Sequence, residues 1–391
     1  MSYLVAFKTF LHFLWRTTTN AFLGSFPAEC PEWCDSTRSS ETPDPPKVHP
    51  FHTGDRRDQS STSLSRRPTL HVGARLAVFG AAVPLLDPTS TQALGKRDER
   101  SMTYRHVTAP TQFVEANGIR FAYRRFGQGS GTPLLFMQHF RGGMDHWDPT
   151  VTDGFAKNRP VILFDNAGVA SSSGETPDTI DAMAEHAADF VGALGISQID
   201  LLGFSIGGYI AQTLTIRHPG LIRRLILVGT GPRAGEPPQD PGYAQYGALT
   251  DPATGQSPIE TYLYLFFRPT ETSQAAGKMF WARRHARKED VDVSTSAQTM
   301  AAQRAAITDW RQPRGERFTE LKAIRQPTLI VNGHNDIMVP TINSFTLSQK
   351  IPNAQLIVYP DSGHGSLFQF PELFVTHAAI FLDGPFAVTG R

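Results

Sequence analysis

The chain has 391 residues, of which 40% are hydrophobic and 19% are charged, proportions typical of a globular protein. Its formal net charge is +1, so it lacks the basic excess that usually accompanies nucleic-acid binding. Both cysteines, Cys30 and Cys34, lie near the N-terminus. This position excludes a cysteine nucleophile, a disulfide framework and a thiolate metal site from the remainder of the chain.

The first hundred residues lack the pattern of a folded domain. Residues 1–28 contain apolar runs interrupted by basic residues, too short for a membrane span, which needs about 20 apolar residues. At most they resemble a weak targeting segment, and we expect a cytoplasmic protein. Residues 35–70 are rich in Ser, Thr, Pro and Arg, a composition typical of disorder. We therefore predict a disordered, low-complexity extension over 1–101 and a folded domain over 102–386.

Segments typical of strands alternate with segments typical of helices from residue 112 onward, which favours a mostly parallel sheet covered by helices. The dipeptide Asn117-Gly118 separates the first two strands and predicts a hairpin. The predicted strands are 112–116, 119–126, 133–139, 161–165, 199–203, 225–229, 328–332 and 356–359. The predicted helices are 179–194 and 206–218, with a further helical stretch after each of the last two strands.

The alternation stops after the sixth strand, where a Gly- and Pro-rich stretch begins. Residues 258–321 then have the pattern of several amphipathic helices without a strand. We expect the segment from approximately 232 to 321 to form a helical lid over one end of the sheet. Within it, the basic run Arg283–Lys288 is interpreted as a solvated helix face. The apolar patches 262–267 and 279–281 are expected to be core, with a few side chains lining a substrate pocket.

The pentapeptide Gly203-Phe-Ser205-Ile-Gly207 matches the pattern G-x-S-x-G and lies between a predicted strand and a predicted helix. In that setting a serine sits on a sharp turn, with its hydroxyl projecting from the end of the sheet. Gly208 would let the start of the helix lie close to the sheet. By itself the match is weak evidence, because a glycine-rich loop with a non-catalytic serine can match the same pattern.

A serine nucleophile needs a base to take its proton. The candidate base is His364, in the loop after the last strand, and the candidate acid is Asp336, in the loop after the preceding strand. Both follow the carboxyl ends of parallel strands, where such sheets bind ligands. The chain order Ser, Asp, His is the one expected for a hydrolase of this architecture. Together with Ser205, these residues form a candidate catalytic triad.

The oxyanion of a tetrahedral intermediate needs hydrogen-bond donors. One candidate is the backbone N–H of Ile206, which follows the nucleophile. The other is the backbone N–H of Phe140 or Arg141, in the glycine-containing loop after the third strand. The Arg141 side chain is also a candidate to bind an acid group of the substrate, with pairing to Asp145 or Asp148 as the alternative.

Residues 111–383 resemble the α/β-hydrolase superfamily, in particular its esterases, lactonases and cofactor-free haloperoxidase-like serine hydrolases. The matching stretches are QHFRGGMDHWDP, ILFDNAGVASSSG, DLLGFSIGGYIAQ, VNGHNDIMVP and YPDSGHGSLFQFPE. The resemblance implies a mostly parallel eight-stranded sheet with a helical lid inserted after the sixth strand. It assigns catalysis to Ser205, Asp336 and His364, and the oxyanion hole to Ile206 with Phe140 or Arg141.

Two departures from the family pattern stand out. The chain has His139-Phe140 where many relatives have His-Gly, and Asp165-Asn-Ala-Gly168 where relatives often have Arg-Gly after the aspartate. A serine at position 205 argues against haloalkane dehalogenases and soluble epoxide hydrolases, which use a carboxylate nucleophile.

The sequence therefore predicts a serine hydrolase that acts through an acyl-enzyme on a small or medium ester, lactone or thioester. The same triad also suits C–C bond hydrolysis, perhydrolysis or a lyase step. A ligand-binding protein without catalysis is the alternative from another class, because a fold does not fix a function. We expect a small-molecule substrate as partner and no nucleic acid, membrane span, metal or cofactor. His334 and Asp336 lack a third metal ligand.

Overall fold

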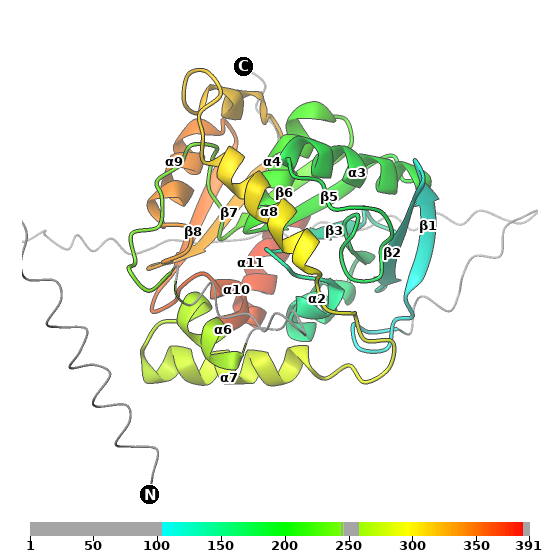
Figure 1. Cartoon of the computed structure of the whole chain (residues 1–391), viewed down its shortest axis with the longest axis horizontal. Helices are drawn as coiled ribbons and strands as arrows, with labels where there is room; N and C mark the ends of the chain where they lie inside the picture. The colour runs from blue at the N-terminus through cyan, green and yellow to red at the C-terminus, as the bar shows by residue number, and fades with distance from the viewer. Residues whose placement is uncertain (1–103, 244, 246–257, 386–391) are drawn as a thin grey trace, which may run out of the picture. The chain divides into compact units, whose positions relative to one another are not determined.

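The computed structural model describes residues 104–243, 245 and 258–385. Eight strands form one sheet in the order β1-β2-β4-β3-β5-β6-β7-β8 (Figure 1). β2 pairs antiparallel with β1 and β4, and the remaining neighbours pair in parallel. This is the mostly parallel eight-stranded sheet that was predicted. The strands are β1 (Gln112–Ala116), β2 (Ile119–Phe126), β3 (Leu134–Met137), β4 (Val161–Phe164), β5 (Ile199–Phe204), β6 (Ile222–Val228), β7 (Thr328–Gly333) and β8 (Ala354–Tyr359).

Helices cover both faces of the sheet (Figure 1). On β3, Leu134 and Phe136 belong to a core cluster that includes residues of α2 and α11. Leu135 and Met137, whose side chains point to the other face, belong to a second cluster with residues of α3 and α4. The helices are α2 (Pro149–Ala156), α3 (Ile180–Ala193), α4 (Ile206–Arg217), α6 (Ile259–Phe266), α7 (Glu271–Arg284), α8 (Ala297–Trp310), α9 (Ile342–Lys350), α10 (Ser366–Gln369) and α11 (Pro371–Asp383), with 3-10 turns η2 (Met144–His146) and η3 (Thr319–Ala323).

Most predicted elements agree with the structure to within a few residues. The N-cap of α3 is Thr179, whose side chain accepts a hydrogen bond from the N–H of Ala182. The helix α2 was not anticipated, although Asp148 caps it and Pro149 occupies its first position, both common helix-start signals. The extension predicted over 1–101 lies outside the described residues.

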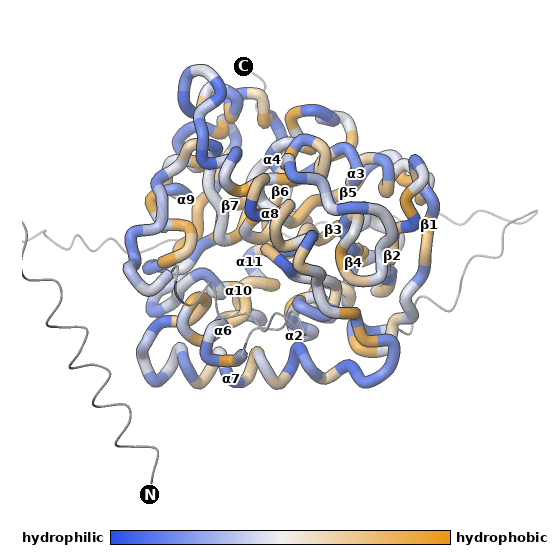
Figure 2. The backbone as a smooth tube through the Cα atoms, viewed as in Figure 1, coloured by the Kyte–Doolittle hydropathy of each residue, from blue (hydrophilic) through white to orange (hydrophobic). Residues whose placement is uncertain are grey.

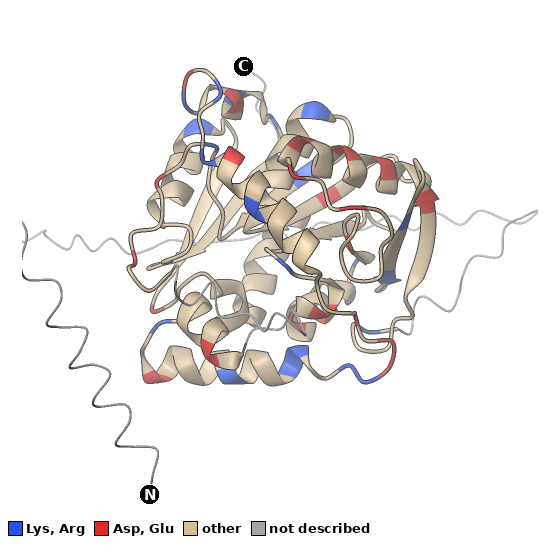
Figure 3. Cartoon of the chain, in the orientation of Figure 1, with Lys and Arg blue, Asp and Glu red and all other residues tan. Residues whose placement is uncertain are grey.

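The predicted helical insertion after the sixth strand is confirmed. α6, α7 and α8 lie between β6 and β7 in the chain, and α8 crosses one face of the molecule in the view of Figure 1. α7 is mostly hydrophilic along its length (Figure 2). Basic residues occupy its C-terminal end and the segment that follows (Figure 3). We refer to the described part of residues 232–321 as the lid.

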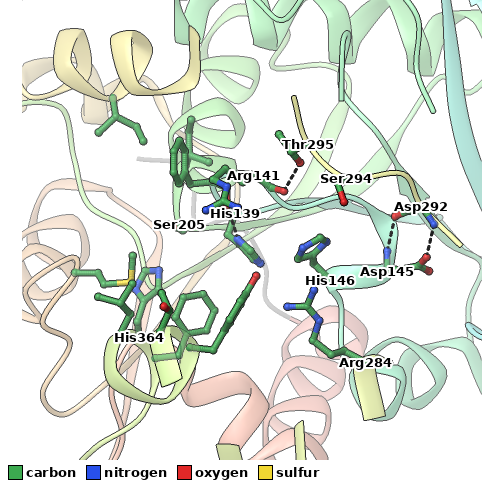
Figure 4. A pocket seen from close by; sticks show the side chains of 18 of the residues that line it. His139, Arg141, Asp145, His146, Ser205, Arg284, Asp292, Ser294, Thr295 and His364 are labelled. Carbon is green, nitrogen blue, oxygen red and sulfur yellow. Dashed lines mark hydrogen bonds between the residues drawn. The ribbon is translucent and has the colours of Figure 1, made fainter. Parts of the chain in front are cut away.

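A buried charge cluster joins the lid to the sheet. Arg124 of β2, whose side chain is fully buried, pairs with Asp145 of η2 and, at 2.8 Å, with Asp292 of the lid. The two aspartates also bond reciprocally: the backbone N–H of each donates to the carboxylate of the other at 2.7 Å (Figure 4). Three segments distant in the chain are therefore held together by one guanidinium and two carboxylates.

Candidate active site

Ser205 occupies the sharp turn between β5 and α4. Its φ of 58° and ψ of −123° lie in a region that non-glycine residues rarely adopt. The surroundings hold it there: its N–H donates to the carbonyl of Val228 at 3.0 Å, and its carbonyl accepts from the Thr230 hydroxyl at 2.8 Å. Both partners lie at the end of β6 or just beyond it, so the neighbouring strand fixes the turn.

The glycines around Ser205 are required by packing. A Cβ atom on Gly203 would lie 2.4 Å from the carbonyl oxygen of Gly207, and one on Gly207 would lie 2.1 Å from that of Met137. A Cβ on Gly208 would lie 2.5 Å from the side chain of Thr230. Close approach of backbone to backbone therefore accounts for the G-x-S-x-G spacing and for the glycine after it.

Asp336 and His364 meet beyond the ends of β7 and β8. Nδ1 of His364 lies 2.7 Å from Oδ2 of Asp336, and both side chains are fully buried. The other carboxylate oxygen, Oδ1, accepts from the N–H groups of Met338 and Val339 at 2.8 and 2.9 Å. The carboxylate is thus held by three hydrogen bonds, one of which fixes the orientation of the imidazole.

The second ring nitrogen of His364 is available for chemistry. Nε2 has no hydrogen-bond partner among the described residues. With the Nδ1 proton directed at Asp336, Nε2 of the neutral ring carries the lone pair. The ring lies against Phe204 and Phe266, with centroid separations of 4.9 and 5.2 Å. His364 and Ser205 line the same cavity, which has a volume of about 670 Å³ (Figure 4).

The loop after β3 supplies the remaining candidate donors. Ile206 is the first residue of α4, and the N–H of a first helical residue has no partner inside its own helix. Arg141 has a φ of 66°, and its N–H donates to Oε1 of Gln303 in α8 at 2.7 Å. The carbonyl of Arg141 accepts from the hydroxyl of Thr295 at 2.6 Å (Figure 4). Phe140 and Ile206 both line the cavity.

The lid forms much of the cavity wall. Its apolar contributors include Tyr262, Leu265 and Phe266 of α6, Trp281 of α7 and Ile307 of α8, together with Tyr243, Val291 and Val293. Four of the nine residues in the predicted apolar patches thus line the cavity, and Leu265, Phe266, Phe267 and Phe280 are buried in the core, whereas Met279 is 56% exposed. The charged lining is mainly basic: Arg141, Arg284, Arg287, Lys288, Arg304 and Arg311 stand against Asp145 and Asp292.

Two histidines lie in the cavity wall near these cations. Burial lowers the pKa of His139 to about 3, and burial together with the charge of Arg284 holds the pKa of His146 well below its usual range. Both rings are therefore neutral at physiological pH. Their ring centroids lie 5.5 Å apart in an edge-to-face arrangement.

The interpretation of the basic run as a solvated helix face is wrong for its central members. Arg284 is 8% exposed and Arg287 is 6% exposed. Arg283 pairs with Asp148 at 2.6 Å, and Asp145 is taken by Arg124, so neither acid considered for Arg141 pairs with it. The sequence pattern suggests a solvated face because Arg283 pairs with Asp148 across 135 positions and Arg287 donates to carbonyls of His106 and Ala109 across more than 170.

The structure brings the predicted residues of catalysis to one end of the sheet, from loops after β3, β5, β7 and β8. Sequence reasoning missed Gln303 and the roles of His139 and His146 in the cavity wall. The sequence could have pointed to the two histidines, because they flank the glycine-containing loop. No local sequence signal marks Gln303. Among the described residues, no cluster of three potential metal ligands occurs. No helix of the described segments has the length and apolarity needed to cross a membrane.

Comparison with known proteins identifies relatives of several activities. The chain is 29% identical over 259 residues to the 2-hydroxymuconate semialdehyde hydrolase of Pseudomonas putida, a match covering 65% of this chain and 88% of that protein. It is 42% identical to an α/β-hydrolase fold protein from Chitinophaga pinensis, covering 72% of this chain and 100% of the other with a TM-score of 0.65. A thermophilic esterase from Thermogutta terrifontis, 23% identical, shares the fold with a TM-score of 0.55 over 70% of this chain and 98% of that one. Residues 132–371 match the family described as the alpha/beta hydrolase fold, and the chain belongs to this family.

Proposed function

We propose that this protein is a serine hydrolase that forms an acyl-enzyme on Ser205. The observation that carries the proposal is the arrangement of His364: Nδ1 is bonded to Asp336 at 2.7 Å, and its ring lines the same cavity as Ser205. A hydroxyl in a strained turn, a base with a free nitrogen and a buried orienting carboxylate are the parts that nucleophilic catalysis needs.

The reaction proceeds in two halves. His364 takes the proton of the Ser205 hydroxyl as its oxygen attacks the substrate carbonyl, and Asp336 stabilises the imidazolium that forms. The histidine then gives this proton to the leaving alcohol, and the acyl group stays on Ser205. In the second half His364 activates water, which releases the acid and restores the enzyme.

Ile206 and Phe140 are the proposed oxyanion donors. The N–H of Arg141 is already bonded to Gln303, whereas the N–H of Phe140 has no partner among the described residues. Gln303 thus favours Phe140 between the two candidates. Removing an oxyanion donor costs about 10²–10³-fold in kcat in serine proteases, so the choice has measurable consequences.

Substrates of this class are small or medium esters, lactones or thioesters. Hydrolysis of a C–C bond by the same residues is a second candidate, which the 29% identity to a 2-hydroxymuconate semialdehyde hydrolase favours. Rates of product formation from aryl esters and from vinylogous diketones separate the two.

Labelling with a fluorophosphonate probe tests the proposal directly. The wild-type protein should be labelled and inactivated with one equivalent, and Ser205→Ala should neither be labelled nor turn over esters. We expect kcat to fall by several orders of magnitude, which leaves a rate about 10³–10⁴-fold above that of the uncatalysed reaction. A folded Ser205→Ala protein with wild-type activity would disprove the nucleophile assignment.

A further inference from the structure

Arg284, the last residue of α7, carries a buried charge for which the described residues provide no carboxylate partner. The residue is 8% exposed and lines the cavity. Its Nε and Nη1 atoms are buried and bond to none of the described residues. The guanidinium instead lies over the rings of Tyr262 and Trp281, 4.8 and 5.1 Å from their centroids. Stacking on aromatic rings orients a guanidinium without using its N–H donors.

The neighbours of Arg284 in the chain provide a direct contrast. Arg283 forms hydrogen bonds from Nε and Nη2 to the carboxylate of Asp148. Arg287 donates to the carbonyls of His106 and Ala109 and to Asp290. Burying a charged donor without a partner is costly, so proteins normally satisfy such groups. Arg284 is the exception within this run.

The acids of the cavity are already committed elsewhere. Asp145 and Asp292 both pair with Arg124, and each accepts the backbone N–H of the other. Among the described residues that line the cavity, cations therefore outnumber carboxylates, and none of these carboxylates pairs with Arg284. A surplus of positive charge favours an anionic ligand.

The polar groups beside Arg284 extend the same site. The N–H of Gly143 donates to Nδ1 of His146 at 3.1 Å, so the proton of the neutral His146 ring is on Nε2. In Figure 4 the Arg284 side chain extends from α7 toward the His146 ring, on the side of the cavity that leads to His139. The site thus contains the charged guanidinium of Arg284 and the neutral Nε2–H donor of His146.

The route from this site to the catalytic residues is apolar. Phe266 lies 5.2 Å from the ring of His364 and 5.2 Å from that of Tyr262, over which Arg284 is stacked. A ligand that reaches both ends must therefore present a reactive carbonyl, an apolar spacer and an anionic end.

We propose that Arg284 binds a carboxylate of the substrate, so that this enzyme acts on esters or lactones bearing a free carboxylate. The inference rests on the proposed function of Ser205. A carboxylate suits the site because a guanidinium holds its two oxygens with parallel hydrogen bonds. Arg284, and not Arg141, then selects the acid group.

Two series of aryl esters test the inference. One consists of p-nitrophenyl monoesters of the C4 to C8 α,ω-dicarboxylic acids, and the other of p-nitrophenyl esters of neutral monocarboxylic acids of equal length. In Arg284→Met, kcat/KM for the best carboxylate ester should fall about 10- to 100-fold, the range expected for a hydrogen bond to a charged group. The change for the neutral ester of equal length should be under threefold.

Lys278→Met is the matched control. Lys278 is an exposed cation of the same helix, and its replacement removes the same charge without touching the cavity. It should leave the preference for carboxylate esters unchanged. Arg284→Lys, which keeps the positive charge, should retain part of this preference. Equal losses for both ester series in Arg284→Met, or an equal loss of preference in Lys278→Met, would overturn the inference.

Binding measurements separate this inference from the proposed function. Calorimetric titration of the dicarboxylate product into Ser205→Ala should give binding that Arg284→Met, in the same background, weakens about tenfold or more. The diamide of equal length should not bind better than the dicarboxylate. Ester turnover without carboxylate preference would refute the Arg284 site alone, whereas dicarboxylate binding without any turnover would refute the hydrolase and leave the site standing.

Discussion

At Asp336 the two carboxylate oxygens have separate tasks. Oδ1 accepts hydrogen bonds from two backbone N–H groups of the loop that follows, those of Met338 and Val339, while Oδ2 faces Nδ1 of His364. The loop thus holds the carboxylate in place even when the histidine moves or changes its protonation. In the proposed mechanism, the loop as well as the aspartate would therefore orient His364.

Asp336→Asn should reduce kcat strongly, but less completely than Ser205→Ala. The asparagine keeps most of the packing but loses the charge that stabilises the imidazolium, and it favours the wrong tautomer of His364. In serine proteases the equivalent change lowers kcat about 10⁴-fold. Steady-state kinetics on an aryl ester measures the effect.

Asp361→Asn provides the control, since Asp361 lies three residues before His364 in the chain. Its carboxylate accepts the hydroxyl of Thr270 at the start of α7, so its role is to anchor the lid. We expect kcat within about tenfold of wild type. An inactive Asp361→Asn beside an active Asp336→Asn would show that the wrong acid was chosen.

Gly207→Ala should destabilise the protein because its Cβ would lie 2.1 Å from the carbonyl oxygen of Met137. Overpacking of this kind typically costs 1–3 kcal/mol, and a clash with backbone belongs at or above the upper end. Urea unfolding measures the free energy. Gly192→Ala near the end of α3 meets no atom within 4 Å, so it should raise stability by about 0.4–1 kcal/mol. Similar values for both variants would contradict the packing argument.

Elements of the lid hold the loop after β3 in place through hydrogen bonds to Arg141. α8 contributes Gln303, and the segment before it contributes Thr295, to the N–H and carbonyl of Arg141. The segment between α7 and α8 contributes Asp292 to the charge cluster around Arg124. A movement of the lid would therefore directly displace the loop that contains Phe140 and Arg141, where an oxyanion donor is proposed.

Arg124→Met should loosen this attachment. Removing the guanidinium leaves Asp145 and Asp292 buried side by side, with only Arg287 still 3.9 Å from Asp145, and breaking a buried pair in this way typically costs about 3–5 kcal/mol. We expect a lower melting temperature and faster proteolysis within residues 285–296. Arg217→Met removes an ion pair from a residue whose side chain is 48% exposed and should cost no more than about 1 kcal/mol. Equal effects of the two changes would mean that the cluster does not hold the lid.

The stability of the whole molecule should depend on pH through its buried histidines. Burial lowers the pKa of His106 and of His139 to about 3 each. Below pH 6.5 the unfolded chain binds protons at these rings and the folded chain does not, so stability falls as the pH falls toward 3. Burial acts in the opposite direction at Asp292, whose pKa is raised to about 6: its contribution to stability is lost as the pH rises through 6.

His106→Asn isolates one of these contributions. His106 lies outside the cavity, and its Nδ1 lies 3.0 Å from the hydroxyl of Thr152, a bond that an asparagine amide can mimic. Between pH 6 and 4 the free energy of unfolding of wild type should fall more steeply than that of the variant, by up to about 1.4 kcal/mol per pH unit. Urea titrations at several pH values measure both slopes. Parallel slopes would show that this ring titrates normally in the folded protein.

Local sequence patterns predicted the features of this protein that depend only on residues close together in the chain. Alternating apolar runs, the Asn117-Gly118 turn and the glycines around Ser205 report on backbone geometry within a few residues, and the strands, the hairpin and the nucleophile turn followed from them. The arrangement of Asp336 and His364 could be anticipated because parallel strands deliver their following loops to one edge of the sheet.

Contacts between distant segments account for what the sequence did not reveal. Gln303 reaches Arg141 across 162 positions, and Asp292 reaches Arg124 across 168. Whether Arg284 faces solvent or the cavity depends on how α7 packs, which no local pattern of charges encodes. The same basic sequence can therefore lie on a surface or in a binding site, depending on which carboxylates the fold brings near it. Asp148 lies near Arg283, whereas among the described residues no carboxylate pairs with Arg284.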